Sequence, residues 1–385
     1  MPLSPTVLNA RDFASRSSTT SGIQEAVNAL PAGGGVVYLP AGKYPLRRSV
    51  ELRSCVTIRG DGPATVLARP KEIWTSVAQP SDGTRKTVHL KQPARGLKVG
   101  DEVYIGDSAS RGWWASHCIV REIRGKTLAL EVLHGMKDKK FLPKRDAFIA
   151  NWFPGFWLRD ISDVTIESVT IEGTDRRLLR DRTDFVVAAV HARDCYDVRV
   201  SRVTVRHWLG DGIGIQGGRG AQVSGCIVEN CVGHGYHPGT GVTQSVWSDN
   251  IARGNTRDGF FFCLRVTHST VRGNILVGNR CHGIGGLTDP DAFNTVIGNV
   301  CAENGMHGID ADRAVGNTIQ GNVCRSNSRC EPGKYAGIYL VGHKHCVVTG
   351  NVCVDDAASP TQVRGLINHD PLGRNTVKDN ECWPE

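Results

Sequence analysis

Acidic and imidazole side chains recur in this sequence directly before a glycine, at intervals of 23 to 25 residues. The segments that carry them are DGIGI, HGYHP, DGFFF, HGIGG and HGIDA, which begin at Asp211, His234, Asp258, His282 and His307. A carboxylate next to a histidine holds one tautomer of the ring and raises its basicity. An alternation of acid and imidazole at one recurring position therefore indicates general acid–base chemistry.

We predict a catalytic cluster around the segment GHGYHPG, in which a second histidine lies two residues after the glycine. The catalytic candidates are His234, His237, Asp258, His282 and Asp211. In this hypothesis Asp258 orients one of the two histidines of the segment. We place the recurring column on the surface, because five buried titratable groups would each cost several kcal/mol. The alternative is that these residues only solvate an exposed corner of a repeating scaffold.

A second set of side chains would hold the substrate. The position two residues after each recurring glycine is expected to face outwards, so Phe261 would offer an exposed ring to a sugar. A cation to neutralise an acidic substrate would come from an arginine near the same strands. The substrate-binding candidates are Arg265, Phe261, His307, Asp310, Asp312 and Arg313. A group of aromatic residues farther towards the N-terminus would either wall the groove or, as we favour, pack on the scaffold: Trp113, Trp114, Trp152, Phe153, Phe156 and Trp157.

Two reactions fit these residues. Elimination or C5 epimerisation of a uronate needs a base near the C5 proton and a cation beside the carboxylate, which the histidines and Arg265 or Arg313 supply. Inverting hydrolysis needs two carboxylates about 6.5–9.5 Å apart. Asp211 and Asp258, two repeats apart, would be separated by about 9.6 Å, and Asp310 and Asp312 by about 6.6 Å. We favour lyase or epimerase chemistry, with hydrolysis second and a non-catalytic sugar-binding protein third.

No cofactor or metal is predicted. Asp289, Asp291, Asp310 and Asp312 would suit Ca²⁺, but their spacing does not require an ion.

The elements that must position these residues form a repeat. The segments SVWSDNIA, STVRGNIL, NTVIGNVC, NTIQGNVC, CVVTGNVC and NTVKDNEC align at Asn250, Asn274, Asn299, Asn322, Asn351 and Asn380. Each unit of about 24 residues holds two or three short strands separated by Gly and Asn corners, which tolerate positive φ. Such a unit predicts one rung of a parallel β-helix.

Stacked rungs place like residues in columns about 4.8 Å apart. The asparagines are therefore expected to form a hydrogen-bonded ladder. Cys301, Cys324, Cys353 and Cys382 form a second column, at places where other repeats carry an apolar residue. We expect these cysteines to be reduced and buried in the core.

The front of the chain departs from the repeat. Residues 1–69 are predicted to contain a short capping helix, with Ile23, Ala26, Val27 and Leu30 at helical spacing, and the first rungs. Residues 70–155 read as an inserted, irregular β-layer. Residues 156–385 read as a parallel β-helix of about nine rungs. The predicted fold is thus all-β, a single-stranded solenoid with a helical cap and an inserted β-layer.

The composition of the chain limits the classes of partner that we expect. The net charge of +8 is spread along the chain without a dense basic block, so nucleic acid is not expected as a partner. No apolar run is long enough to cross a membrane, so no membrane association is expected. The N-terminus lacks the features of a signal peptide, which predicts a cytoplasmic protein unless the start has been trimmed. The oligomeric state is left open by these residues.

The opening of the chain, with ARDF, GIQEAVNAL, GGGVVYLPAGKYPL and VTIRGDG, resembles the start of the pectate-lyase-like superfamily of right-handed β-helix proteins. The resemblance implies a right-handed β-helix with a sugar groove along one sheet, and a carbohydrate as substrate. Members include lyases, hydrolases, epimerases and phage tailspikes. The motif CHGIGG is similar to one motif of the polygalacturonase-type hydrolases, but their Asp-Asp pair is missing, so no single member family is indicated.

Overall fold

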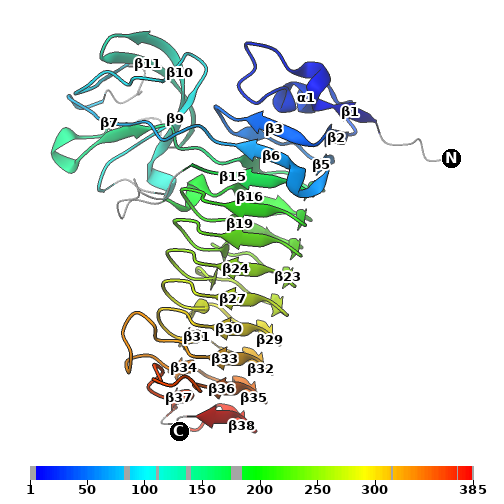
Figure 1. Cartoon of the computed structure of the whole chain (residues 1–385), viewed down its shortest axis with the longest axis vertical. Helices are drawn as coiled ribbons and strands as arrows, with labels where there is room; N and C mark the ends of the chain where they lie inside the picture. Colours follow the sequence, from blue (N-terminus) through cyan, green and yellow to red (C-terminus); the bar gives the residue numbers. More distant parts are fainter. Residues whose placement is uncertain are drawn as a thin grey trace.

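The structure, a computed structural model, describes residues 6–81, 87–109, 112–135, 140–174, 184–313, 315–370 and 372–383. Within these ranges the chain winds into an elongated solenoid with three parallel sheets along its length (Figure 1). The predicted parallel β-helix is therefore confirmed. No helix of the described residues is long and apolar enough to cross a membrane.

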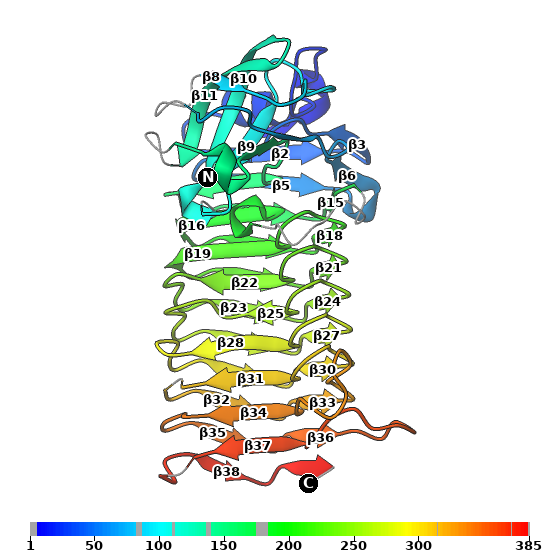
Figure 2. The ribbon, with the colours of Figure 1, turned by 90° about the vertical axis from the view of Figure 1, so that its left-hand side faces the viewer.

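The ten-stranded sheet carries the residues singled out for chemistry. Its strands are β4 (Val50–Glu51), β13 (Phe156–Arg159), β16 (Val190–Tyr196), β19 (Ile213–Arg219), β22 (Tyr236–Gly239), β25 (Phe260–Phe261), β28 (Ile284–Thr288), β31 (Ile309–Asp312), β34 (Ile338–Val341) and β37 (Leu366–His369). Figure 2 shows these strands lying one below the other along the solenoid.

Two further sheets complete each rung. The twelve-stranded sheet contains β1 (Val7–Asn9), β2 (Gly35–Leu39), β5 (Val56–Gly60), β14 (Thr165–Glu167), β17 (Arg199–Ser201), β20 (Gln222–Ser224), β23 (Val246–Ser248), β26 (Thr270–Arg272), β29 (Thr295–Ile297), β32 (Thr318–Gln320), β35 (Val347–Thr349) and β38 (Thr376–Lys378). The eleven-stranded sheet contains β3 (Gly42–Pro45), β6 (Thr65–Ala68), β15 (Thr170–Glu172), β18 (Thr204–Arg206), β21 (Ile227–Glu229), β24 (Ile251–Arg253), β27 (Ile275–Val277), β30 (Val300–Ala302), β33 (Val323–Arg325), β36 (Val352–Val354) and β39 (Glu381–Trp383).

The short strands bury one residue in two, as alternation requires. The middle residue of most three-residue strands points into a common core, as Val228 and Leu276 do. The position after each recurring glycine is also fully buried, as predicted for Tyr236 and Phe260. Helix α1 (Ile23–Ala29) packs Ile23, with Ala26 and Val27, into the same core.

The asparagine column forms the expected ladder. The side-chain oxygen of Asn274 accepts from both the backbone N–H and the amide of Asn250, at 3.0 Å each. The same double contact joins Asn274 to Asn299 and continues to Asn380. A second ladder, which the repeat analysis did not identify, runs from Asn255 to Gln362. These bonds satisfy buried amides, which unpaired would each cost about 1–3 kcal/mol.

The cysteine column packs as apolar side chains would. Cys301, Cys324 and Cys353 are fully buried, and Cys382 in the last rung is partly buried. The thirteen cysteines all lie within the described residues, and none is joined to another by a disulfide.

The recurring glycines are needed for a reason other than the predicted one. Gly235 does not have a positive φ. A Cβ added there would instead lie 2.4 Å from the carbonyl oxygen of Gly259 in the next rung. Gly283 and Gly308 meet the same obstacle, at 2.6 Å. The expectation of positive φ at these glycines is therefore wrong, because the close stacking of backbones, not the dihedral angle, excludes a side chain.

An antiparallel sheet is inserted between β6 and β13. Its strands are β7 (Trp74–Ser76), β8 (Thr87–His89), β9 (Glu102–Gly106), β10 (Ser116–Arg124), β11 (Thr127–Gly135) and β12 (Phe148–Ala150). It has its own apolar core around Val103, Val120 and Ile149. Figures 1 and 2 show it at the N-terminal end of the solenoid, beside the first rungs of the ten-stranded sheet.

The contact between the inserted sheet and the solenoid contains histidines. The ring of His134 stacks on that of Trp157 at 4.1 Å, and His191 lies 5.0 Å from the same indole. His191 is fully buried, and neither of its ring nitrogens has a hydrogen-bond partner. Burial lowers the pKa of His191 to about 3 and that of His134 to about 4. Both rings therefore stay neutral in the folded protein at neutral pH.

Candidate functional site

A cavity of about 760 Å³ opens on the outer face of the ten-stranded sheet, next to the inserted sheet. Two short segments close one side of it: η3 (Gly112–Trp114) from the inserted region and η6 (Phe185–Val187), which precedes β16. Its lining residues are Gly112, Trp113, Trp114, Asp184, Phe185, Asp211, Gln216, His234, His237, Thr240, Arg257, Asp258, Phe261, Cys263, Cys281, His282, Gly286, Thr288, Met306 and Asp310. All five residues predicted to be catalytic are among them.

Four of the five members of the recurring acid and imidazole column are buried and His282 is partly buried, so the predicted place of the column on the surface is wrong. Asp211, Asp258 and His307 are 2%, 5% and 7% exposed. Each member accepts a backbone N–H from the next rung, which offsets the cost of burial. The accepting atoms are Asp211 Oδ1 (from His234), His234 Nδ1 (from Asp258), Asp258 Oδ1 (from His282), His282 Nδ1 (from His307) and His307 Nδ1 (from Ala336), at 2.7, 3.3, 2.7, 3.2 and 2.9 Å.

This backbone contact decides the tautomer of two histidines. A ring nitrogen that accepts a hydrogen bond carries no proton, so neutral His282 and His307 hold theirs on Nε2. His307 stacks on Tyr339 at 4.5 Å and does not line the cavity. Burial, with a contribution from His282, lowers the pKa of His307 to about 3. His307, predicted to bind substrate, thus lies outside the cavity lining and packs against the scaffold.

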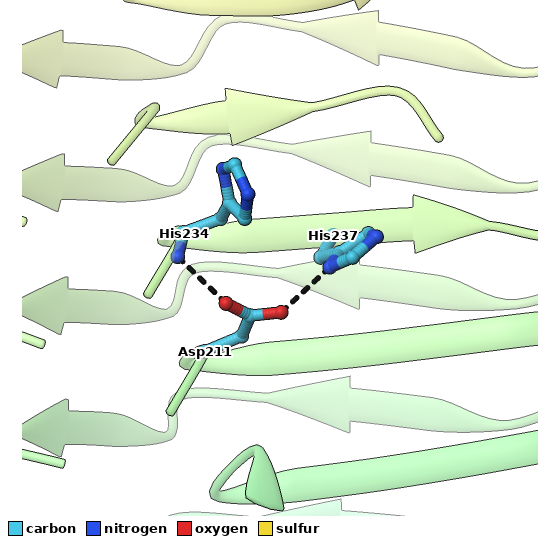
Figure 3. A group of neighbouring side chains, drawn as sticks. All are labelled: Asp211, His234 and His237. Carbon is cyan, nitrogen blue, oxygen red and sulfur yellow. Dashed lines mark hydrogen bonds and ion pairs between the residues drawn. The ribbon is translucent and has the colours of Figure 1, made fainter. Parts of the chain in front are cut away.

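His237 differs from the column because its ring is held by a carboxylate. Its Nδ1 lies 2.6 Å from Asp211 Oδ2, while Asp211 Oδ1 accepts the backbone N–H of His234 (Figure 3). Burial opposes the charge on His237, but Asp211 outweighs it and raises the pKa of His237 to about 9. Burial likewise opposes the charge on Asp211, and His237 lowers its pKa to about 2. Asp211, not Asp258, therefore orients His237.

His237 lines the cavity, and its other ring nitrogen is not held by a protein group. The side chain is 4% exposed, and Nε2 is buried without a hydrogen-bond partner. A Nδ1–H held by a carboxylate leaves Nε2 as the atom that accepts or donates a proton. His237 and Asp211 thus form an imidazole–carboxylate dyad at the wall of the cavity.

His234 and Asp258 form a second pair beside the dyad. His234 Nδ1 lies 3.3 Å from the backbone nitrogen of Asp258 and 3.1 Å from its Oδ2. A neutral His234 accepts from the peptide, whereas a protonated one donates to the carboxylate. The ring of His234 also stacks on Phe261 at 4.2 Å. Phe261 thus covers a histidine as well as lining the cavity.

The far side of the cavity carries His282 and Asp310, whose Nε2 and Oδ2 atoms lie 3.8 Å apart. Burial raises the pKa of Asp310, partly offset by His282.

Three predicted substrate-binding residues do not reach the cavity. Arg265, Asp312 and Arg313 are absent from its lining, and Arg313 pairs instead with Asp312 at 3.0 Å. Among the arginines and lysines that the structure describes, the one in the cavity lining is Arg257, an exposed residue that sequence reasoning missed. Its position directly before Asp258 in TRDGF is the signal that would have identified it. Trp113 and Trp114 line the cavity, so the expectation that they only pack on the scaffold is wrong.

Asp211, His234 and His237 also meet the simplest condition for a metal site, since their ligand atoms lie within 4.8 Å of one another. Both oxygens of Asp211 are already occupied by N–H groups, however. The arrangement is that of a hydrogen-bonded dyad, and we assign no metal to it.

Comparison with known proteins agrees with the fold. The family described as right handed beta helix region matches residues 154–323. A search of curated protein sequences gave no match.

Similar solved structures include the A-module of mannuronan C-5 epimerase AlgE4 from Azotobacter vinelandii, with 18% identity, a TM-score of 0.55, and coverage of 98% of this chain and 95% of that one. The enzymatically active domain of tailspike protein 2 from bacteriophage CBA120 has 11% identity, a TM-score of 0.55, and coverage of 92% and 43%. The polygalacturonase of Erwinia carotovora ssp. carotovora has 12% identity, a TM-score of 0.50, and coverage of 93% and 81%. The chain therefore has a right-handed parallel β-helix fold.

Proposed function

We propose that this protein is a carbohydrate-active enzyme that removes the C5 proton of a uronate, in β-elimination or epimerisation. The observation that carries the proposal is the His237–Asp211 dyad, which lines a cavity of about 760 Å³ and leaves Nε2 of His237 without a hydrogen-bond partner. An epimerase and a polygalacturonase among the structures of similar fold support a carbohydrate as the substrate.

In this reaction His237 Nε2 is the base. The C5 proton is weakly acidic, and a base with a pKa of about 9 accepts it more readily than an ordinary imidazole does. Only the neutral ring can accept a proton, and with this pKa about one hundredth of the His237 side chains are neutral at pH 7. We therefore expect activity to rise with pH up to about 9.

The negative charge that develops on the substrate carboxylate requires a cation. Arg257 lines the same cavity and supplies it. Phe261 and Trp114 offer aromatic faces to the sugar rings. The base, the cation and the aromatic faces thus occur on one cavity, as a uronate requires.

Hydrolysis is disfavoured by the contacts of the carboxylates on which it would depend. Asp211 and Asp258 each bind an imidazole and a backbone N–H, and Asp312 lies outside the cavity. The two pairs considered from the sequence thus lack the acid and base that inverting enzymes use.

The test is incubation with polymannuronate, polygalacturonate and a neutral polysaccharide in deuterated water. We expect deuterium at C5 or an unsaturated product from at least one polyuronate, and neither from the neutral polymer. His237→Gln should abolish both signals, and Asp379→Asn, at an exposed site near the last strand, should not. Products that have gained water without deuterium at C5 would contradict the proposal.

A further inference from the structure

One thiol lies on the same face of the sheet as His237. Cys263 follows β25, and its backbone pairs with Gly239, two residues after His237 on β22. Side chains two residues apart in a strand point to the same face, so Cys263 lies diagonally across from His237. It is partly exposed and lines the same cavity.

The imidazole beside this thiol has a free nitrogen. Nδ1 of His237 is held by Asp211 at 2.6 Å, and Nε2 is buried without a hydrogen-bond partner. The thiol is near enough to add to the raised pKa of His237, after the larger effects of burial and Asp211. Asp211, His237 and Cys263 thus neighbour one another in the wall of one cavity. A carboxylate, an imidazole and a thiol are the three groups that together activate a cysteine nucleophile.

We propose that Cys263 is a nucleophilic thiol, activated by the His237–Asp211 dyad, and that the cavity takes acyl esters as a second class of substrate. This inference goes beyond the proposed uronate chemistry and does not depend on it. The dyad serves both reactions, since each needs a proton acceptor at Nε2.

The acyl transfer balances with water as the co-reactant. The thiol proton moves to His237 Nε2 as Sγ bonds to the ester carbonyl carbon. The bond from that carbon to the alkoxide oxygen then breaks, and the alkoxide takes the proton from Nε2. Water next attacks the thioester, its proton passes to Nε2, and the carboxylic acid and the thiol are released.

The first experiment compares thiols within one folded molecule. The protein is treated with limiting iodoacetamide at neutral pH, and peptide mass spectrometry gives the alkylation rate of each cysteine. We expect Cys263 to react at least about tenfold faster than the exposed Cys55 and Cys330, because Cys263 shares its cavity with the imidazole of His237. His237→Gln should remove the difference. A rate for Cys263 no higher than that of Cys330 in the wild type would overturn the proposal.

The second experiment uses p-nitrophenyl acetate. We expect a burst of nitrophenolate with an acetyl group on the Cys263 peptide, and loss of both in Cys263→Ser. Acetylation spread over lysines, with no burst, would overturn the proposal. Neither experiment involves a uronate, so a negative result here does not affect the proposed C5 chemistry. A negative result with polyuronates likewise does not affect the test of Cys263.

Discussion

The exchange of Asp211 for asparagine tests how the dyad works. Asp211 has two tasks, since Oδ1 accepts the N–H of His234 and Oδ2 accepts from Nδ1 of His237. Asparagine has one oxygen. The buried N–H of His234 would keep it, because losing that partner would cost about 1–3 kcal/mol. The amide NH₂ of asparagine would then face His237.

The consequence for His237 is a reversed tautomer. An amide NH₂ donates to Nδ1, so the proton of the neutral ring moves to Nε2, the atom that must accept the substrate proton. Loss of the carboxylate also removes the cause of the raised pKa of His237, which is about 9 in the native protein. We therefore expect the ring to titrate below about 6.5, because burial alone lowers the pKa of a histidine.

Two measurements follow. The maximal kcat/KM of Asp211→Asn on the polyuronate substrate should fall by about 10²-fold or more, the scale of lost general base catalysis. The pH at which kcat/KM reaches half its maximum should fall by more than about two units from about 9. Circular dichroism and the urea midpoint should stay close to those of Asp379→Asn, the surface control.

The result that would refute the reasoning is specific. If kcat/KM of the wild type falls as the pH rises towards 9, protonated His237 is the active form and is not the base. If Asp211→Asn keeps both its rate and its pH profile, the dyad takes no part in proton transfer.

Other expectations concern recognition and stability. Arg257→Met should raise KM for a polyuronate about tenfold or more and leave the pH profile in place, whereas an unchanged KM would exclude Arg257 as the carboxylate partner. Burial holds the pKa of His191 near 3 and that of His134 near 4, whereas a histidine in the unfolded chain has a pKa of about 6.5. The folded state is therefore favoured fully above about pH 6.5, where both rings are neutral in either state. This stability is lost as the pH falls towards 3 to 4, because the unfolded chain binds protons that the folded chain does not. His191→Phe should therefore lessen the acid-induced drop in the urea midpoint, and an unaltered drop would place the acid sensitivity elsewhere. Gly235→Val should prevent soluble folding because its side chain would strike the carbonyl of the next rung, and a native melting temperature would contradict that packing argument.

Much of the fold could be predicted because its signals repeat. The Asn250 to Asn380 column, the buried apolar position after each glycine and the helix at Ile23 each depend on local spacing, which sequence shows directly. The right-handed sense of the β-helix was predicted from the resemblance of the opening of the chain to a known superfamily, not from the spacing of the repeat. The inserted sheet was recognised only as an irregular layer, since its strand pairing is set by contacts between distant residues.

The sequence predicted which residues would come together at the candidate site better than it predicted how they contact one another. Spacing brought His234, His237 and Asp258 to one place, but the burial of their column depended on peptide N–H groups of neighbouring rungs, which spacing does not reveal. Arg257 was missed because it lies in the corner between β24 and β25, where the alternation of side chains along a strand does not predict which way a residue points. Trp113 lines the cavity from η3 of the inserted region, about 120 residues before the histidines in the sequence and outside the repeat, so the repeat could not predict its position.

The order of acids and imidazoles along the column can be explained by counting acceptor atoms. Every member must accept one peptide N–H from the following rung, and a histidine has a single ring nitrogen for that purpose. A carboxylate has two oxygens, and the second is free for another partner. The chain has aspartate at 211 and 258, where a second oxygen meets the imidazole of His237 or His234, and histidine at 307, where the backbone contact is the only demand. At 211 and 258 the column thus combines the stacking of rungs with the positioning of a second imidazole, which a histidine at 307 does not provide.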